Sequence, residues 1–294
     1  MADDSLRLMT VHAHPDDESS KTAGTVALYS SQGARTVLVT CTGGEAGDVL
    51  NPAVEKPETE VEMAALRLDE LRAATAILGY SEVRMLGYRD SGMLGSEDND
   101  HPESFAGADL DEATGRLVEI IREERPQVLI AYGDEHTFYP HPDHVRAHEV
   151  AVAAFDAAGD PDRFAQAGEP WQPLKLYYTA WSRALVEAWI TAFDTEGGES
   201  PFGAWLEGRE FQDERFTTRI NVNEHFERRR EALLAHRSQV DPTSFFMRIR
   251  NEIMSEIFPW EEYMLARSLV DTGTEEGEWE TDLFAGVREV AHRP

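Results

Sequence analysis

Lysine and cysteine are scarce in this sequence. Lysine occurs only at positions 21, 56 and 175, so arginine supplies nearly all of the positive charge. Cys41 is the single cysteine, which excludes a disulfide within the chain and fits a reducing compartment. The acidic start, Met1 to Asp4, is followed by no apolar segment of the signal-peptide type. Together these absences predict a cytoplasmic protein.

Long apolar runs and an excess of positive charge are also missing. The sequence has no apolar stretch of about 20 residues, the length that a helix needs to span a bilayer. The 27 Lys and Arg residues face 56 Asp and Glu residues, which gives a formal net charge of −29. Such a field repels phosphate groups, so we expect neither a nucleic acid nor an anionic membrane as a partner. An apolar content of 41% in 294 residues nevertheless supports a large folded core.

Segments typical of strands and helices alternate along the first part of the chain. A strand is predicted over 6–11, a helix over 22–31 and a second strand over 36–41, which together make a βαβ unit. The same alternation continues through strands expected at 83–86 and 128–132. This order of elements predicts an α/β fold with a mostly parallel sheet.

The alternation weakens after about residue 160. One more strand is expected at 176–179, and the patterns over 222–239 and 260–269 predict two helices. We therefore expect a core in residues 1–160 and a smaller, mixed C-terminal portion in residues 161–294 that completes the substrate pocket. The two portions are expected to form one integrated domain.

Two clusters of polar residues follow strands of the expected sheet. The first is residues 12–18 (HAHPDDE), and the second is residues 139–144 (YPHPDH). Because ligands of such sheets bind at the carboxyl ends of the strands, we expect the clusters to meet. Imidazole plus carboxylate is the ligand set of catalytic zinc, with three protein ligands and one open position. One His and one Asp from the first cluster and one His from the second would complete this set. The remaining carboxylate would be a general base, and residue types leave open which Asp has which role.

The two clusters resemble the motifs of a known family. They look like those of the zinc-dependent N-deacetylases related to N-acetylglucosaminyl-phosphatidylinositol de-N-acetylase, the LmbE-like family. Further matches are residues 42–45 (TGGE), 67–71 (RLDEL), 90–92 (DSG) and 236–239 (HRSQ). The resemblance runs from Leu6 to Arg267. It implies a Rossmann-like three-layer sandwich and a Zn²⁺ ion, and a His/Asp/His site can also accept Fe²⁺.

The resemblance also implies a role for individual residues. Three residues would bind the metal ion: His14, Asp17 and His144. Asp16 would be the general base that activates water. Three further residues would assist catalysis. His141 would stabilise the tetrahedral intermediate or protonate the leaving amine. Tyr139 would polarise the amide carbonyl, and Asp143 would orient an active-site histidine. Four residues would contact the substrate: Lys21, Glu45, Arg67 and Asp90.

Within this family, the sequence is most similar to the amidases that cleave mycothiol S-conjugates. These enzymes act in detoxification and release a mercapturic acid, an N-acetylcysteine S-conjugate, together with glucosaminyl-inositol. The resemblance rests on Lys21, on residues 45–53 (EAGDVLNPA), and on GEPW at 168–171 before KLYY at 175–178. The alternative is an N-deacetylase of an N-acetylglucosamine derivative such as N-acetylglucosaminyl-inositol. In both cases the partner is a small molecule, and the oligomeric state stays open.

A third hypothesis and several structural roles compete with this interpretation. A catalytically silent carbohydrate-binding protein would have damaged metal or base positions, whereas all of these positions are intact here. Glu18 can be explained as a carboxylate in the first turn of a helix. Residues 236–239 can be explained as packing of the C-terminal portion on the core. Three tryptophans could form a wall for aromatic or lipophilic conjugates, although core packing is the favoured explanation: Trp181, Trp189 and Trp205.

The acidic composition predicts a dependence of stability on salt. Apart from the few carboxylates assigned to the site, the acidic residues are typical of the hydrated surface of a salt-adapted protein. Because dissolved ions screen the repulsion between like charges, we expect the melting temperature to rise from low to molar KCl. Thermal unfolding in a KCl series, followed by circular dichroism, measures this. A melting temperature that falls with added KCl would contradict the salt adaptation.

Overall fold

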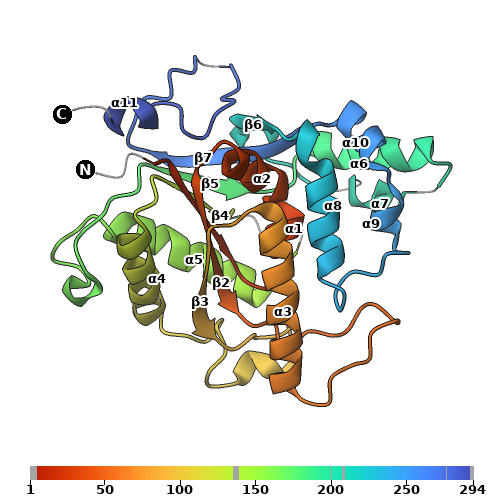
Figure 1. Cartoon of the computed structure of the whole chain (residues 1–294), viewed down its shortest axis with the longest axis horizontal. Coiled ribbons are helices and arrows are strands. Elements are labelled where there is room, and N and C mark those ends of the chain that lie inside the picture. Colours follow the sequence, from red (N-terminus) through yellow and green to blue (C-terminus); the bar gives the residue numbers. More distant parts are fainter. Residues whose placement is uncertain (1–4, 135–138, 199, 207–208, 276, 292–294) are drawn as a thin grey trace.

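A sheet of seven strands forms the centre of the computed structural model, which describes residues 5–134, 139–198, 200–206, 209–275 and 277–291 (Figure 1). The order of the strands across the sheet is β3-β2-β1-β4-β5-β7-β6. The strands are β1 (Arg7–His12), β2 (Arg35–Thr42), β3 (Glu82–Tyr88), β4 (Val128–Tyr132), β5 (Lys175–Thr179), β6 (Thr218–Asn221) and β7 (Trp260–Ser268). Strands β1 to β5 are parallel, and β7 and β6 extend the sheet in antiparallel pairing. This confirms the mostly parallel α/β sheet.

Helices cover both faces of this sheet and complete three layers. The longer helices are α2 (Ala23–Ser31), α3 (Glu60–Leu78), α4 (Leu110–Glu124), α5 (Pro142–Ala157), α6 (Arg183–Thr195) and α8 (Phe226–Ala235). Helices α4 and α5 pack on one face, and α2, α3, α6 and α8 pack on the other (Figure 1). The short helices are α1 (Asp17–Lys21), α7 (Gly203–Leu206), α9 (Phe245–Arg248), α10 (Asn251–Ile257) and α11 (Val287–Ala291). None of the helices in the described ranges is both long and apolar enough to cross a membrane.

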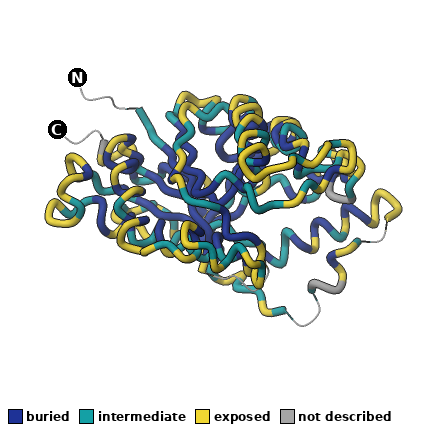
Figure 2. Tube along the Cα trace, turned by 90° about the horizontal axis from the view of Figure 1, so that it is seen from below, coloured by how far each residue is buried: buried dark blue, intermediate teal, exposed yellow. Residues whose placement is uncertain are grey.

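The apolar patterns of the strands explain why the sheet is the inner layer. Along β1 the side chains alternate between the two faces, so Met9 and Val11 join the core under α4 and α5 while Leu8 joins the core on the other face. All five residues of β4 are buried, as expected for a parallel strand covered on both sides. Figure 2 shows the buried residues in the interior of the molecule and the exposed residues on the outer turns.

The helix expected over 260–269 is wrong, because this segment forms strand β7. Its Met, Leu, Ala and Glu residues favour a helix locally. The segment instead pairs with β5 on one side and with β6 on the other. Without β7, the edge of β5 would expose a row of unpaired backbone groups, so tertiary pairing overrides the local preference. The charged helix expected over 222–239 is shorter than predicted and corresponds to α8.

The sheet includes strands from both sides of residue 160. Strands β5, β6 and β7 continue the same sheet that β1 to β4 begin. The division into a core of residues 1–160 and a C-terminal portion of residues 161–294 stays a prediction.

A buried ion pair fastens the C-terminal segment to this sheet. Lys175 at the start of β5 is fully buried, and its Nζ donates to Oε1 of Glu280. The other carboxylate oxygen of Glu280 accepts from the hydroxyl groups of Tyr177, at 2.7 Å, and Thr218, at 2.9 Å. Glu280 lies in the segment after β7 and thus connects this segment to both β5 and β6.

We expect Glu280→Ala to destabilise the protein strongly. The substitution leaves the Lys175 ammonium group buried without its carboxylate, which costs about 3–5 kcal/mol of unfolding free energy. Urea unfolding measures this loss. Glu278→Ala is the matched control, because Glu278 is exposed and its substitution should change stability by less than about 0.5 kcal/mol. Equal stabilities of the two variants would contradict the structural role of Glu280.

Candidate metal centre

The two polar clusters of the sequence meet at one edge of the sheet. The first cluster follows β1 and leads into α1, and the second precedes α5 after β4. Strands β1 and β4 are neighbours, and the order of the chain reverses between them. This is the position at which open α/β sheets bind ligands. The two clusters therefore come together at this edge, as the sequence predicted.

Three buried side chains form a group that could hold a metal ion: His14, Asp17 and His144. Oδ2 of Asp17 lies 3.4 Å from Nδ1 of His14 and 3.4 Å from Nε2 of His144. A tetrahedral zinc ion with bonds of about 2.0–2.1 Å places its ligand atoms about 3.3–3.4 Å apart. The donor set and its spacing therefore fit a tetrahedral metal ion.

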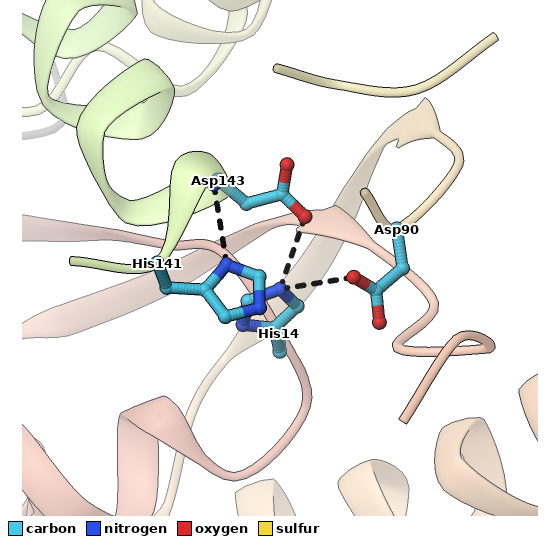
Figure 3. A group of neighbouring side chains, drawn as sticks. All are labelled: His14, Asp90, His141 and Asp143. Carbon is cyan, nitrogen blue, oxygen red and sulfur yellow. Dashed lines mark hydrogen bonds and ion pairs between the residues drawn. The ribbon is translucent and has the colours of Figure 1, made fainter. Parts of the chain in front are cut away.

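The other ring nitrogen of His14 faces two further carboxylates. Nε2 of His14 lies 3.1 Å from Oδ2 of Asp143 and 3.5 Å from Oδ1 of Asp90, and His141 completes this second group (Figure 3). Asp143 is itself fixed, because the backbone N–H of Ser91 donates to its Oδ2 at 2.9 Å and the Ser91 hydroxyl donates to its Oδ1. A histidine that ligates a metal usually donates its other N–H to a carboxylate. Asp143 has that position relative to His14.

Burial and neighbouring charges set the protonation of this group. Burial lowers the pKa of His144 to about 3, so its imidazole is neutral, as metal ligation requires. Burial also disfavours the charged forms of His14 and Asp17. The surrounding carboxylates outweigh burial at His14 and raise its pKa, while Lys21 and His144 lower the pKa of Asp17 well below its usual range.

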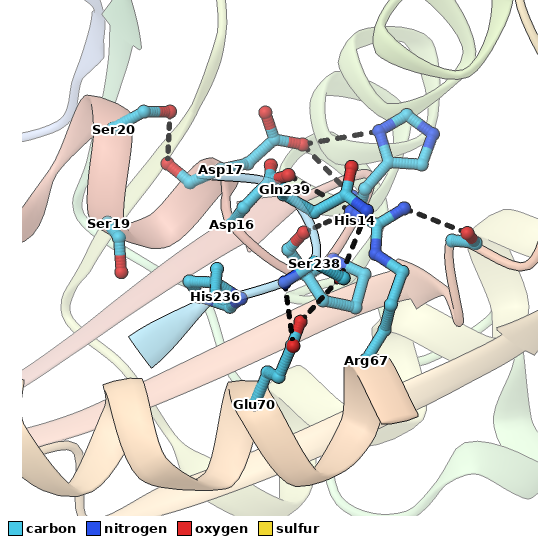
Figure 4. A network of polar contacts seen from close by, with 12 residues as sticks. His14, Asp16, Asp17, Ser19, Ser20, Arg67, Glu70, His236, Ser238 and Gln239 are labelled. Atoms are coloured by element: carbon cyan, nitrogen blue, oxygen red, sulfur yellow. Dashed lines mark hydrogen bonds and ion pairs between the residues drawn. The ribbon is translucent and has the colours of Figure 1, made fainter. Parts of the chain in front are cut away.

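Asp16 is held in a strained conformation beside this group. Its φ of 109° lies in the left-handed region, which residues other than glycine rarely adopt. The Asp16 N–H donates to Oε2 of Glu18 at 2.9 Å. The guanidinium of Arg67 donates to Oδ2 of Asp16 at 3.0 Å, and Figure 4 shows these two residues close together. Burial raises the pKa of the Asp16 carboxyl, and Arg67 opposes part of that rise. A carboxylate with a raised pKa suits a general base.

Behind Asp16 lies a buried ion pair that sequence reasoning assigned to packing. Nε2 of His236, just after α8, lies 2.7 Å from Oε1 of Glu18, and both side chains are fully buried. Burial disfavours both charges, but each residue stabilises the other: the pKa of His236 is raised and that of Glu18 is lowered. Ser238 in the same segment donates to both carboxylate oxygens of Glu70 on α3. The motif at 236–239 therefore supports the loop that carries Asp16.

Arg67 also fixes the backbone of two loops around the site. Its guanidinium donates to the carbonyl oxygens of Gly44, at 2.8 Å, and Pro15, at 2.5 Å. Gly44 has a φ of +69°, and a Cβ atom there would lie 2.1 Å from Nη1 of Arg67, so only glycine fits. Nε of Arg67 and Oε2 of Glu45 are buried without a partner among the described residues. The predicted substrate contacts of these two residues stay predictions.

The rings of His141 and Tyr139 lie close to the two histidines of the metal group. Nδ1 of His141 accepts from the backbone N–H of Asp143 at 3.2 Å, and burial lowers the pKa of His141 to about 4. The neutral ring therefore carries its proton on Nε2. Tyr139 is 48% exposed, and the centroid of its ring lies 5.1 Å from that of the His144 ring. Nζ of Lys21 lies 2.6 Å from Oδ1 of Asp17.

The structure adds Tyr132 to the residues that the sequence singled out. The Tyr132 hydroxyl lies at the end of β4, donates to Oδ2 of Asp17 at 2.6 Å and accepts from the backbone N–H of Ala13 at 2.8 Å. It thereby fixes the carboxylate that connects the two histidines. Its only signal in the sequence is a tyrosine at the last position of a buried apolar strand, which core packing explains equally well.

A pocket of about 380 Å³ opens onto this group. Its walls include Asp16, Asp17, Lys21, Tyr139 and His144, so it brings together the predicted base, two predicted metal ligands and two other predicted residues. Trp181 and Trp189 also line the pocket, and the Trp205 side chain lies outside the described residues. A second, more polar pocket of about 550 Å³ is lined by Glu45 and by residues between 87 and 116.

The segment that contains both clusters matches a known protein family. The family model of the GlcNAc-PI de-N-acetylases, PIG-L, matches residues 9–155, the segment that contains both clusters. The chain belongs to the PIG-L family. It is 43% identical to the mycothiol S-conjugate amidase of Streptomyces coelicolor, over 98% of this chain and 99% of that protein. Membership of the PIG-L family makes the chain a hydrolase that acts on C–N bonds other than peptide bonds.

Two further relatives complete the comparison of this PIG-L family member. The 1D-myo-inositol 2-acetamido-2-deoxy-alpha-D-glucopyranoside deacetylase of Geodermatophilus obscurus is 40% identical, over 96% of this chain and 98% of that protein. The N,N'-diacetylchitobiose deacetylase of Pyrococcus horikoshii has the same fold, with a TM-score of 0.64 at 17% identity, covering 90% of this chain and 85% of that chain. Both amidases and deacetylases of small molecules therefore resemble this chain.

We expect Glu18→Gln to lower kcat without loss of metal. The amide has one acceptor oxygen instead of two, so it cannot accept from both Asp16 and His236, and the base loses its alignment. A small misplacement of this kind costs about 10–100-fold in rate. Steady-state kinetics on an N-acylated glucosamine substrate, with metal content measured in parallel, checks this. Glu119→Gln, at an exposed position on α4, is the control. Loss of metal from the Glu18 variant, or an unchanged kcat, would contradict the positioning role.

Proposed function

We propose that this chain is a zinc-dependent amidase that hydrolyses mycothiol S-conjugates to an N-acetylcysteine S-conjugate and glucosaminyl-inositol. Fe²⁺ is the alternative metal ion, because an open His/Asp/His set suits both ions. The observation that carries the proposal is the buried group of His14, Asp17 and His144, with Asp16 beside it in the wall of the same pocket. The similarity to the Streptomyces coelicolor amidase supports the choice of substrate.

The residues of the metal group have distinct tasks in this mechanism. His14, Asp17 and His144 would hold the ion, which when bound acidifies water and polarises the substrate carbonyl. The carboxylate of Asp16 accepts the proton of the attacking water. The Asp16 side chain is 30% exposed and lines the pocket, so water can reach it. The Arg67 guanidinium and the Glu18 carboxylate keep Asp16 in place during this transfer.

Two donors above the group handle the charge that develops on the substrate. His141 carries its proton on Nε2, because its Nδ1 accepts from the backbone of Asp143. This N–H can donate a hydrogen bond to the substrate oxygen, while the leaving amine takes up the proton that Asp16 accepted from the attacking water. The phenol of Tyr139 can donate to the carbonyl oxygen as that oxygen becomes negative. Both groups are donors in their neutral forms, so they require no prior protonation at neutral pH.

Substrate contacts follow from the polar side of the site. Glu45 and Arg67 each keep one buried hydrogen-bonding atom without a partner among the described residues, and these atoms suit hydroxyl groups of a sugar or inositol. Asp90 lies next to His14, with its Oδ1 3.5 Å from Nε2 of His14. Lys21 lines the pocket of about 380 Å³ beside Asp16 and is assigned to the acyl side of the substrate.

The alternative function is deacetylation of N-acetylglucosaminyl-inositol. It is favoured by the 40% identity to the Geodermatophilus obscurus deacetylase. We prefer the amidase because the pocket beside Asp16 has a volume of about 380 Å³, and an acetyl group would occupy a small part of it. An N-acetylcysteinyl group with a substituent on sulfur uses that space. The two activities are separated by the turnover of a bimane conjugate of mycothiol compared with that of N-acetylglucosaminyl-inositol.

We expect Asp16→Asn to abolish most of the activity while metal remains bound. Asparagine cannot accept the proton, and loss of a general base typically costs about 10²–10⁴-fold in kcat. His144→Ala is the companion variant, which should lose both metal and activity because it removes a ligand. Metal analysis under anaerobic conditions and kinetics on both substrates distinguish these outcomes. Activity retained by a metal-loaded Asp16 variant would refute the assignment of the base.

A preference of the native enzyme for N-acetylglucosaminyl-inositol over the bimane conjugate would refute the amidase function and leave the metal centre and the base intact. Loss of turnover of both substrates in Asp16→Asn therefore tests the chemistry. The ratio of the two native rates tests the choice of substrate.

A further inference from the structure

We propose that the pocket beside the metal group contains a subsite for an uncharged aromatic substituent on the sulfur atom of the conjugate. The subsite is formed by Trp181, Leu185, Trp189 and Trp260, which we call the aromatic wall. This inference rests on the proposed amidase function and specifies which substrates the enzyme selects.

The wall lies further along the same sheet edge as the metal group. Trp181 comes two residues after β5, the strand next to β4, and Leu185 and Trp189 project from α6 directly behind it. Trp260 begins β7, which runs antiparallel to β5 and therefore starts at the carboxyl end of β5. The fold thus places the wall next to the carboxyl ends of the strands that carry the metal ligands.

The wall is preformed rather than assembled around a ligand. The rings of Trp181 and Trp189 meet edge to face, with centroids 5.2 Å apart, and the ring of Trp189 also packs on Phe202 at 5.0 Å. Trp189 is buried, while Trp181 and Trp260 are half-buried. Rigid aromatic surfaces of this kind bind apolar and aromatic groups without a large cost of ordering.

The wall and the reaction centre belong to one cavity. The pocket that the wall lines is also lined by Asp16, Asp17 and His144. A substrate whose amide carbonyl lies at the metal group therefore directs its acyl chain into this cavity. In an N-acetylcysteinyl amide, the longest branch of that chain carries the sulfur substituent, which is the part that reaches the wall.

The charges around the pocket restrict the substituent further. Carboxylates outnumber cations in its lining: Asp16, Asp17, Glu210, Glu261 and Glu262 face Lys21 and Arg229. Three of these carboxylates have ion-pair partners: Asp17 is paired with Lys21, Asp16 with Arg67 and Glu262 with Arg219. The lining that remains is Glu210 and Glu261 against Arg229, so the excess of charge is still negative. An anionic substituent would enter a field of its own sign, so the pocket selects neutral substituents over anionic ones.

The test compares conjugates that differ only in the sulfur substituent. S-methyl, S-benzyl and S-(4-carboxybenzyl) mycothiol share the amide and the sugar, and kcat/KM is measured from the amine that each releases. We expect the native enzyme to prefer S-benzyl to S-methyl by about tenfold or more, and S-benzyl to carboxybenzyl by about tenfold. We expect Trp181→Ala to reduce the benzyl-to-methyl ratio about tenfold.

Two further variants distinguish loss of the subsite from a general folding defect. Leu185→Ala shortens the same wall without removing a ring and should also reduce the benzyl-to-methyl ratio. Trp171→Ala is the matched control. Trp171 donates from Nε1 to the carbonyl of Pro126 at 2.7 Å and packs against the core under α4 and α5, on the other face of the sheet. The benzyl-to-methyl ratio of this variant should therefore equal that of the native enzyme. Metal content is measured for every variant.

Equal kcat/KM for S-benzyl and S-methyl in the native enzyme would overturn the subsite and leave the proposed amidase function standing. A benzyl-to-methyl ratio that Trp181→Ala and Leu185→Ala leave unchanged would do the same. A carboxybenzyl conjugate cleaved as fast as S-benzyl would overturn the charge selection. If no conjugate is cleaved while N-acetylglucosaminyl-inositol is, the amidase function itself fails.

Discussion

The burial of one carboxylate, Asp17, is the constraint on which the site depends. A buried carboxylate is costly unless cations and hydrogen-bond donors surround it. Asp17 meets this requirement with groups from separate parts of the chain: the Tyr132 hydroxyl from β4, the backbone N–H of His14 and the ammonium group of Lys21. His144 reaches the same oxygen from α5. The partners that make its burial tolerable are thus also the ones that bring the two histidines to the spacing of metal ligands.

The same principle extends outward to the general base. Asp16 keeps a strained backbone only because its surroundings fix it on several sides. Arg67 holds it from α3, and Glu18 holds it from α1 with the support of His236 after α8. The segment that ends α8 is distant from β1 in the sequence, yet it completes the support of the base. Catalytic geometry here is therefore a property of both parts of the chain, although the predicted ligands all lie in the first 160 residues.

The sequence predicted which clusters meet better than it predicted the residues that support them. The clusters at 12–18 and 139–144 follow buried strands, and parallel topology alone brings them to one edge. The roles of Tyr132, Ser91 and His236 depend on contacts between distant segments, for which a hydroxyl in a strand or an imidazole after a helix gives no local signal. Strand β7 was missed for the same reason: its residues favour a helix, and only the open edge of β5 makes it a strand. Trp181 and Trp189 were assigned to packing, and they do pack together, but they also face the pocket.

These observations divide the work of the enzyme between two regions of the fold. The segments from β1 to α5 supply every residue of the metal group, so in the proposed mechanism they determine which bond is broken. The segments from β5 to β7 supply the aromatic wall, which lies in the cavity next to that group. Because relatives with about 40% identity are named both as amidases and as deacetylases, the metal group alone cannot distinguish the two substrates. The space on the acyl side of the amide can distinguish the two substrates, because hydrolysis of an acetamide needs no room beyond the carbonyl carbon and its methyl group. We therefore infer that the substrate is selected by the part of the chain in which the sequence pattern was weakest.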